Sequence, residues 1–158
     1  MTGNAGSGKS TLGRIVAQKK SLPLFSLDSI VWREGWQKAT SDEVRRGVSN
    51  LISKRAWVID GVDYEILKAA DVVIFLDFPR KVSFYRAAIR NRKFLFTSRP
   101  DLPANCPEIL IIPKLIKIIW KFPKRVRPKI LAEKIRRGDT SFVHIQNNKQ
   151  LKEYLDSL

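Results

Sequence analysis

The chain has 158 residues, of which 44% are hydrophobic and 28% charged, and its formal net charge is +15. This length and composition predict one globular domain over residues 1–158 and exclude a disordered chain. A single cysteine excludes a disulfide framework, and no apolar run approaches the ~20 residues of a membrane span, so we expect a cytoplasmic protein without a transmembrane segment.

The positive charge is concentrated in one part of the chain. Residues 80–137 contain 17 Lys and Arg but only 3 Asp and Glu, whereas the rest of the chain is nearly neutral. A basic segment of this kind predicts an anionic partner. Nucleotide phosphates, nucleic acid and an acidic membrane surface all remain possible at this point.

The chain begins MTGNAGSGKST, which fits the phosphate-loop pattern G-x-x-x-x-G-K-[ST]. Its three glycines allow successive backbone N–H groups to surround a phosphate oxygen. Lys9 is expected to reach the β- and γ-phosphates of ATP, and the Ser10 hydroxyl to bind Mg²⁺. The predicted ATP-binding residues of this loop are Gly3, Asn4, Ala5, Gly6, Ser7, Gly8, Lys9, Ser10 and Thr11.

Strands and helices are expected to alternate after this loop. The predicted strands are 22–28, 56–61, 71–77 and 140–147. The predicted helices are 11–17, 40–55, 80–96, 107–122, 128–137 and 148–158, with two helical turns at 63–70. The helix at 40–55 should be capped by Thr40 or Ser41. Apolar strands between helices predict an α/β fold, in which a parallel sheet has helices on both faces.

Three of the predicted strands end in an acid, and ligands bind at this end of a parallel sheet. Asp60 and Asp77 are both candidates to hold Mg²⁺ or its waters. Gly61 would leave room for a ligand beside Asp60, whereas Asp77 could equally be a turn or cap residue. Asp28 could accept a proton from a phosphoryl acceptor, or it could be an ordinary loop carboxylate.

Arginines in the basic segment could stabilise the charge of a transferring phosphoryl group. Arg86 and Arg90 share one helix face, which could also be a solvated basic surface. Arg99 lies in the proline-rich loop 97–107, and Arg125 and Arg127 flank the start of a later helix. Together these three predict a mobile lid over the phosphates, at about residues 94–128.

Several other side chains have both a structural and a functional interpretation. A lysine stripe on the predicted helix 107–122 and its end is typical of a surface helix, although a nucleic-acid or lipid surface is the alternative: Lys114, Lys117, Lys121 and Lys124. Trp32 and Trp36 could line an acceptor pocket, stack on a base or pack within their loop. Structural roles are expected for His144 and Cys106.

The chain resembles the bacterial P-loop proteins known as topology modulation proteins, which are relatives of adenylate and shikimate kinases. The motifs that carry this resemblance are GNAGSGKST (3–11), LDSIVWREGW (27–36), WVIDG (57–61), IFLDFPR (74–80), RPDLPANCPE (99–108) and WKFPKRVRPKI (120–130). The resemblance implies a five-stranded parallel sheet of order 2-3-1-4-5. It also implies that Asp60 is the Walker B-type acid and that Asp28 and residues 32–36 face the acceptor. It further implies lid roles for Arg99, Arg125 and Arg127, and lid-hinge roles for Arg86 and Arg90.

The chain differs from these relatives at its start. They usually have several apolar residues before the first loop glycine, whereas only Met1 and Thr2 precede Gly3 here. Losing most of a central strand would leave backbone groups on both neighbouring strands without partners. We therefore expect a truncated first strand and a natural chain that begins further upstream.

These features predict an ATP- and Mg²⁺-dependent phosphotransferase of the nucleoside and nucleotide kinase class. It would transfer the γ-phosphoryl group to a small-molecule hydroxyl or phosphate, whose identity the residues leave open. The alternative is a basic nucleic-acid-binding regulator, related to DNA topology, that uses ATP as a switch and binds through residues 80–137.

Overall fold

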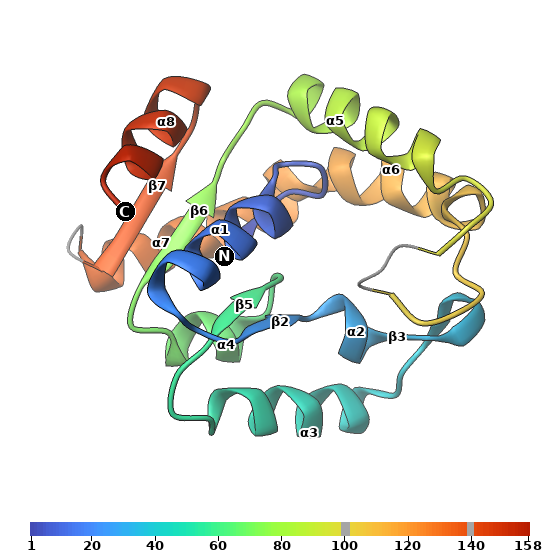
Figure 1. The fold of residues 1–158 in the computed structure, drawn as a ribbon, viewed down its shortest axis with the longest axis horizontal. Helices are drawn as coiled ribbons and strands as arrows, with labels where there is room; N and C mark the ends of the chain where they lie inside the picture. Colours follow the sequence, from blue (N-terminus) through green and yellow to red (C-terminus); the bar gives the residue numbers. More distant parts are fainter. Residues whose placement is uncertain (99–101, 139–140) are drawn as a thin grey trace.

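Two short parallel sheets lie at the centre of the computed structural model, which describes residues 1–98, 102–138 and 141–158 (Figure 1). The first contains, in spatial order, β1 (Thr2–Gly3), β6 (Val73–Leu76) and β7 (Phe142–Ile145). The second contains β2 (Leu24–Ser26) and β5 (Val58–Asp60). A separate antiparallel hairpin is formed by β3 (Trp32–Arg33) and β4 (Gln37–Lys38). The predicted α/β class with a parallel sheet is therefore confirmed.

Met1 connects the two parallel sheets by hydrogen bonds. Its amino nitrogen donates to the carbonyl of Ile59 at 2.8 Å, and the Gly61 amide donates to the Met1 carbonyl at 3.1 Å. On the other side, Thr2 of β1 is in register with Phe75 of β6. The strand that leads into the glycine-rich loop, β1, is only two residues long. It pairs with β6, and Met1 directly before it bonds to Ile59 of β5.

Eight helices surround the sheets in the described part of the chain (Figure 1). They are α1 (Lys9–Lys20), α2 (Asp28–Val31), α3 (Ser41–Ile52), α4 (Tyr64–Ala69), α5 (Arg80–Lys93), α6 (Glu108–Arg125), α7 (Arg127–Arg137) and α8 (Asn148–Asp156), with a 3₁₀ turn at Glu34–Trp36. Thr40 and Glu43 form a reciprocal capping box at the start of α3, which confirms Thr40 as the cap. None of the helices in these three ranges combines the length and apolar character needed to cross a membrane.

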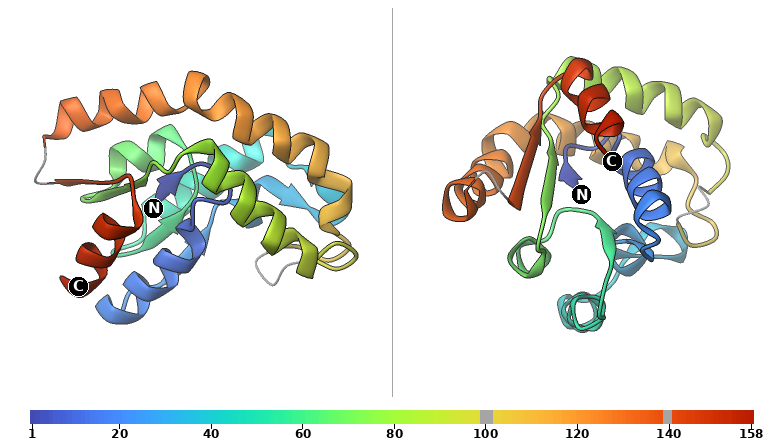
Figure 2. Two further views of the ribbon diagram at one scale, coloured as in Figure 1. Left: turned by 90° about the horizontal axis from the view of Figure 1, so that it is seen from above. Right: turned by 60° about the vertical axis from the view of Figure 1, so that its left-hand side comes forward.

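The most buried strand, β6, has apolar side chains on both faces. Phe75 packs with Phe122 of α6 and Ile130 of α7, whereas Leu76, on the opposite face, packs with Leu12 of α1. Figure 2 shows α7 on one side of β6 and β7, and α1 and α8 on the other. Helices thus cover both faces, which explains why this strand is apolar throughout.

A buried carboxylate fastens α7 to the end of α4. Glu133 is 3% exposed and accepts hydrogen bonds from the Arg136 and Arg137 guanidinium groups. Arg137 also donates to carbonyls at the end of α4, including Ala70 at 2.5 Å and Lys68 at 2.8 Å. These carbonyls have no partners within their own helix, so Arg137 acts as their cap.

Glu133→Gln is expected to change how stability depends on pH. Hydrogen bonds from Arg136 and then Arg137 lower the pKa of Glu133 from 4.5 to about 2. Because the folded state has the lower pKa, this stabilisation is complete above pH 4.5 and is lost as the pH falls towards 2. The variant should unfold about 2–3 kcal/mol more easily at pH 7 and show a weaker pH dependence between these limits in urea denaturation.

Glu153→Gln provides a matched control, because Glu153 forms an exposed pair with Lys149 at 3.9 Å. Its loss should stay below ~0.5 kcal/mol at pH 7. Equal losses in both variants would contradict the role given to Glu133.

Candidate functional site

The end of β1 and the loop that follows it approach neighbouring backbone too closely for side chains at two positions. A Cβ atom at Gly3 would lie 2.5 Å from the Leu76 carbonyl oxygen, and one at Gly6 would lie 2.3 Å from the Ser83 carbonyl oxygen. Both glycines also have positive φ angles, of 146° and 76°. Only glycine fits this geometry without a shift of β6 or α5. The loop is therefore a tight turn that leads directly into the N-terminus of α1.

Lys9 is the first residue of α1 and folds back over this loop. Its Nζ donates a hydrogen bond to the Asn4 carbonyl at 2.9 Å. The ammonium group therefore lies beside the turn, next to a helix N-terminus that itself carries a partial positive charge. Both features favour an anion at this position.

Ser10 and Asp60 meet at the same place, although 50 residues separate them in sequence. The Ser10 hydroxyl donates a hydrogen bond to Asp60 Oδ2 at the end of β5. Asp60 is 8% exposed, and its second oxygen, Oδ1, is buried without a hydrogen-bond partner among the described residues. A buried carboxylate oxygen in this position can accept a hydrogen bond or bind a cation. Two hard oxygen donors of this kind fit Mg²⁺.

A metal held by protein alone does not fit these residues. No group of three or more His, Cys, Asp or Glu side chains that could hold a metal occurs in the described part of the chain. A Mg²⁺ ion at Ser10 and Asp60 would need phosphate oxygens and waters to complete its ligands, as is usual for this ion. Gly61 does not supply the expected space, because a Cβ there would lie 2.4 Å from Leu27 Cβ.

Asp77, the other candidate for the metal, has different partners. Arg127 Nε lies 2.9 Å from both carboxylate oxygens, and His144 Nε2 lies 2.9 Å from Oδ2. The bond to Asp77 raises the pKa of Arg127. His144 also stacks on Phe75, with ring centroids 5.1 Å apart. Asp77 thus joins α7 to the sheet, and the proposed nucleotide contact of Arg127 stays a prediction.

Arg86 braces the glycine-rich loop from α5. Its guanidinium group donates to the Ser7 carbonyl at 3.0 Å and to Asn148 Oδ1 at 2.9 Å, and it lies over the Phe78 ring. Arg90, one turn further along α5, donates to Asn91 Oδ1 at 3.1 and 3.2 Å. The structure therefore brings Arg86 to the loop. It gives Arg90 a contact on its own helix.

Sequence reasoning missed a direct contact between the loop and α6. The Asn4 side-chain amide donates to the Ile119 carbonyl at 3.1 Å, and both residues are almost completely buried. In a regular helix the residue four positions later would donate to this carbonyl, but that residue is Pro123, which has no N–H. Asn4 replaces the missing donor. A proline inside a helix was the available signal, although it did not identify Asn4.

The tryptophan hairpin packs against the segment before α6. Trp36 Nε1 donates to the Pro107 carbonyl at 2.8 Å, and the Trp36 amide donates to the buried Cys106 Sγ at 3.3 Å. Lys114 Nζ lies 4.0 Å from the Trp32 ring centroid. These contacts favour loop packing for both tryptophans and the structural role expected for Cys106.

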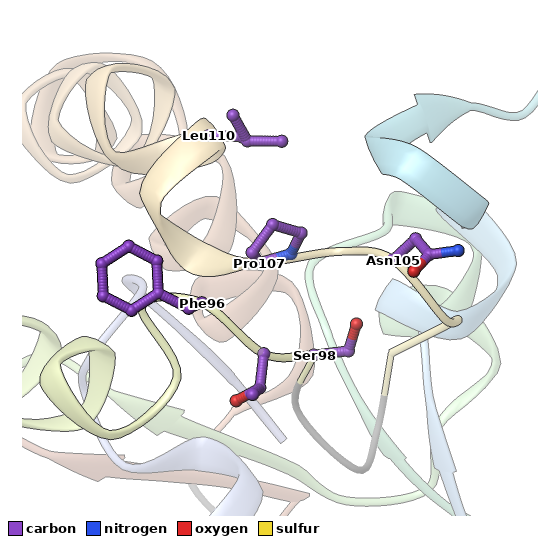
Figure 3. A pocket seen from close by; sticks show the side chains of 6 residues that line it. Phe96, Ser98, Asn105, Pro107 and Leu110 are labelled. Atoms are coloured by element: carbon purple, nitrogen blue, oxygen red, sulfur yellow. The ribbon is translucent and has the colours of Figure 1, made fainter.

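A cavity of about 440 Å³ lies in the same segment, between the end of α5 and the start of α6 (Figure 3). Its described lining residues are Phe96, Thr97, Ser98, Asn105, Pro107 and Leu110. None of these belongs to the glycine-rich loop. The cavity is therefore a feature of the expected lid segment rather than of the loop.

The remaining predicted site residues lie in different surroundings. Asp28 begins α2, is exposed, and follows β2, whose last residue Ser26 is in register with Asp60. Arg125 is exposed at the end of α6. Arg99 lies outside the described residues. The structure therefore brings Asp28 to the sheet end that carries Asp60. The roles of both arginines stay predictions.

No protein-family model matches this chain, and no curated protein matches it.

Asn4→Ala should lower the free energy of unfolding by about 1–3 kcal/mol, because it leaves the buried Ile119 carbonyl without a donor. Pro123→Ala creates an amide N–H that can bond to this carbonyl within the helix. The loss on Asn4→Ala should therefore be at least ~1 kcal/mol smaller in a Pro123→Ala background, measured as a double-mutant cycle by denaturation.

Pro113→Ala is the matched control, because Pro113 is the other proline inside α6 and lies six residues before Ile119, whose carbonyl bonds to Asn4. The cost of Asn4→Ala should be unchanged in that background. A smaller cost in both proline backgrounds would argue against the specific contact.

Proposed function

We propose that the chain is an ATP- and Mg²⁺-dependent phosphotransferase of the nucleoside and nucleotide kinase-like class. The observation that carries the proposal is the contact of Ser10 with Asp60 beside the glycine-rich loop. Among the described residues, this contact leaves one buried carboxylate oxygen without a hydrogen-bond partner near the N-terminus of α1. Phosphoryl transfer to or from a nucleotide uses three parts that occur together here. They are a loop that needs glycine, a lysine folded over that loop, and a serine that contacts an acid.

The phosphates of ATP would bind in the turn of residues 3–8, against the N-terminus of α1. The Lys9 ammonium would leave the Asn4 carbonyl and bind the β- and γ-phosphates. Ser10 and Asp60 would hold Mg²⁺, which neutralises phosphate charge when bound. Arg86 would keep the turn in place through Ser7 rather than bind the γ-phosphoryl group.

The acceptor would bind on the side of Asp28. Its hydroxyl oxygen would form a bond to the γ-phosphorus as the bond to the β–γ bridging oxygen breaks and ADP leaves. The hydroxyl proton would pass to the Asp28 carboxylate. For a phosphate acceptor, no proton transfer is needed. Arg90, Arg99, Arg125 and Arg127 remain the candidates to neutralise the moving charge.

The proposed relationship to topology modulation proteins includes the sheet order 2-3-1-4-5. The hydrogen bonds of Met1 to Ile59 and Gly61 support this order, because they bring the β1 end of one sheet beside β5 of the other. In the labels of Figure 1 this order is β2-β5-β1-β6-β7. It would set the loop at the centre of the carboxyl edge, where α/β proteins bind ligands.

Calorimetric titration with Mg·ATP tests the proposal. Lys9→Met should weaken binding at least ~10-fold, and Asp60→Asn should reduce the dependence of binding on Mg²⁺, because both remove charges next to the phosphates. Lys20→Met at the exposed end of α1 is the charge-matched control and should bind normally. ADP release with a panel of nucleotides and hydroxyl compounds would then identify the acceptor.

Equal ATP affinity in the native, Lys9→Met and Lys20→Met proteins would overturn the proposal. ATP binding without ADP release for any acceptor would restrict it to a nucleotide-binding role.

A further inference from the structure

The outer side of α6 exposes an apolar stripe. Ile109, Ile116 and Trp120 are each 45–61% exposed, and their spacing puts them on one side of the helix. Ile119 and Phe122, on an adjoining side of α6, are buried in the protein interior. Buried side chains such as Ile119 and Phe122 already hold the helix in the fold. The exposed stripe is a second apolar surface that this packing does not use. These large apolar side chains would be removed from water only if another surface covered them. An exposed apolar stripe of this kind is therefore a candidate interaction surface.

A basic stripe runs beside the apolar one. Lys117, Lys121 and Lys124 are exposed, and the first two directly follow Ile116 and Trp120 in the sequence. The only acid of α6 is Glu108 in its first turn, and this residue is buried. Another cation lies close by, because the Arg80 guanidinium stacks on the Trp120 ring at 4.4 Å. The exposed part of α6 is thus both apolar and purely cationic.

The combination of the two stripes discriminates between possible partners. Nucleic acid would bind the lysines but leave the two isoleucines in water, since phosphate contacts are polar. A second copy of the chain would bring two segments of the same large positive charge together, which costs free energy. An anionic bilayer provides phosphate groups for lysine, a headgroup region for tryptophan and an acyl boundary for isoleucine.

We propose that the outer face of α6 docks on the surface of an anionic lipid bilayer. The helix would lie parallel to the membrane plane. Ile109, Ile116 and Trp120 would enter the boundary between headgroups and acyl chains, and the three lysines would contact lipid phosphates. Binding would be reversible and would weaken with salt, because part of it is electrostatic. This inference does not depend on the proposed phosphotransferase activity.

The test uses the full chain and its flotation with lipid vesicles. Vesicles of phosphatidylcholine with phosphatidylglycerol should bind the protein at physiological salt, whereas vesicles of phosphatidylcholine alone should not. The Ile116→Gln/Trp120→Gln double variant removes the apolar stripe, and Lys117→Gln/Lys121→Gln removes neighbouring charges. Each should lower the partition coefficient on anionic vesicles at least ~10-fold.

Matched controls lie on α7, where Ile135 is 85% exposed and Lys129 is also exposed. Ile135→Gln and Lys129→Gln should change partitioning by less than ~2-fold. Because all substituted side chains are exposed, circular dichroism should show native melting for every variant. Ile109→Gln replaces the apolar double variant if that protein melts early.

Two results would overturn the proposal. The first is absence of flotation with anionic vesicles. The second is full retention of binding by the apolar variants with loss in the lysine variant, which would indicate a site for polyanions. Duplex DNA tested at the same salt would then distinguish nucleic acid as the partner.

Discussion

Residues 3–8 pass so close to β6 and α5 that two positions, Gly3 and Gly6, have no room for a side chain, and the rest of the candidate site depends on this close approach. A Cβ atom at Gly3 or Gly6 would lie within 2.5 Å of a carbonyl oxygen of these elements. The loop is therefore held between a buried strand and a helix, with Arg86 bonded to it from outside. Because the loop is held in this position, α1 begins where Lys9 bonds to the Asn4 carbonyl and Ser10 bonds to Asp60 at the end of β5.

Helix α6 takes part in two separate surfaces. Its inner side bonds to the loop through Asn4, at a carbonyl that Pro123 leaves without a donor. A proline inside a helix normally costs about 3 kcal/mol, and the buried contact with Asn4 offsets part of this cost. The outer side of the same helix exposes apolar and basic side chains. The loop and the most basic part of the chain are thus in direct contact.

Two acids with similar sequence surroundings differ completely in their tertiary contacts. Asp60 and Asp77 each follow an apolar strand. Asp77 is satisfied by Arg127 and His144, whereas Asp60 bonds to Ser10 and retains an oxygen without a partner in the described residues. Asp77, which lies between Arg127 and His144, joins elements of the fold. Asp60, whose second oxygen is not used in this way and lies near a helix N-terminus, is suited to bind a cation.

The sequence alone determined the features that depend on neighbouring residues. These are the alternation of strands and helices, a cap at Thr40 or Ser41 and the need for glycine in the loop. The tertiary structure alone decided the contacts between distant residues, such as Asn4 with Ile119, 115 positions apart, and Trp36 with Pro107. It also decided which of two acids faces the loop. The physical reason is that local spacing fixes backbone geometry and side-chain direction, whereas a distant partner depends on how whole elements pack.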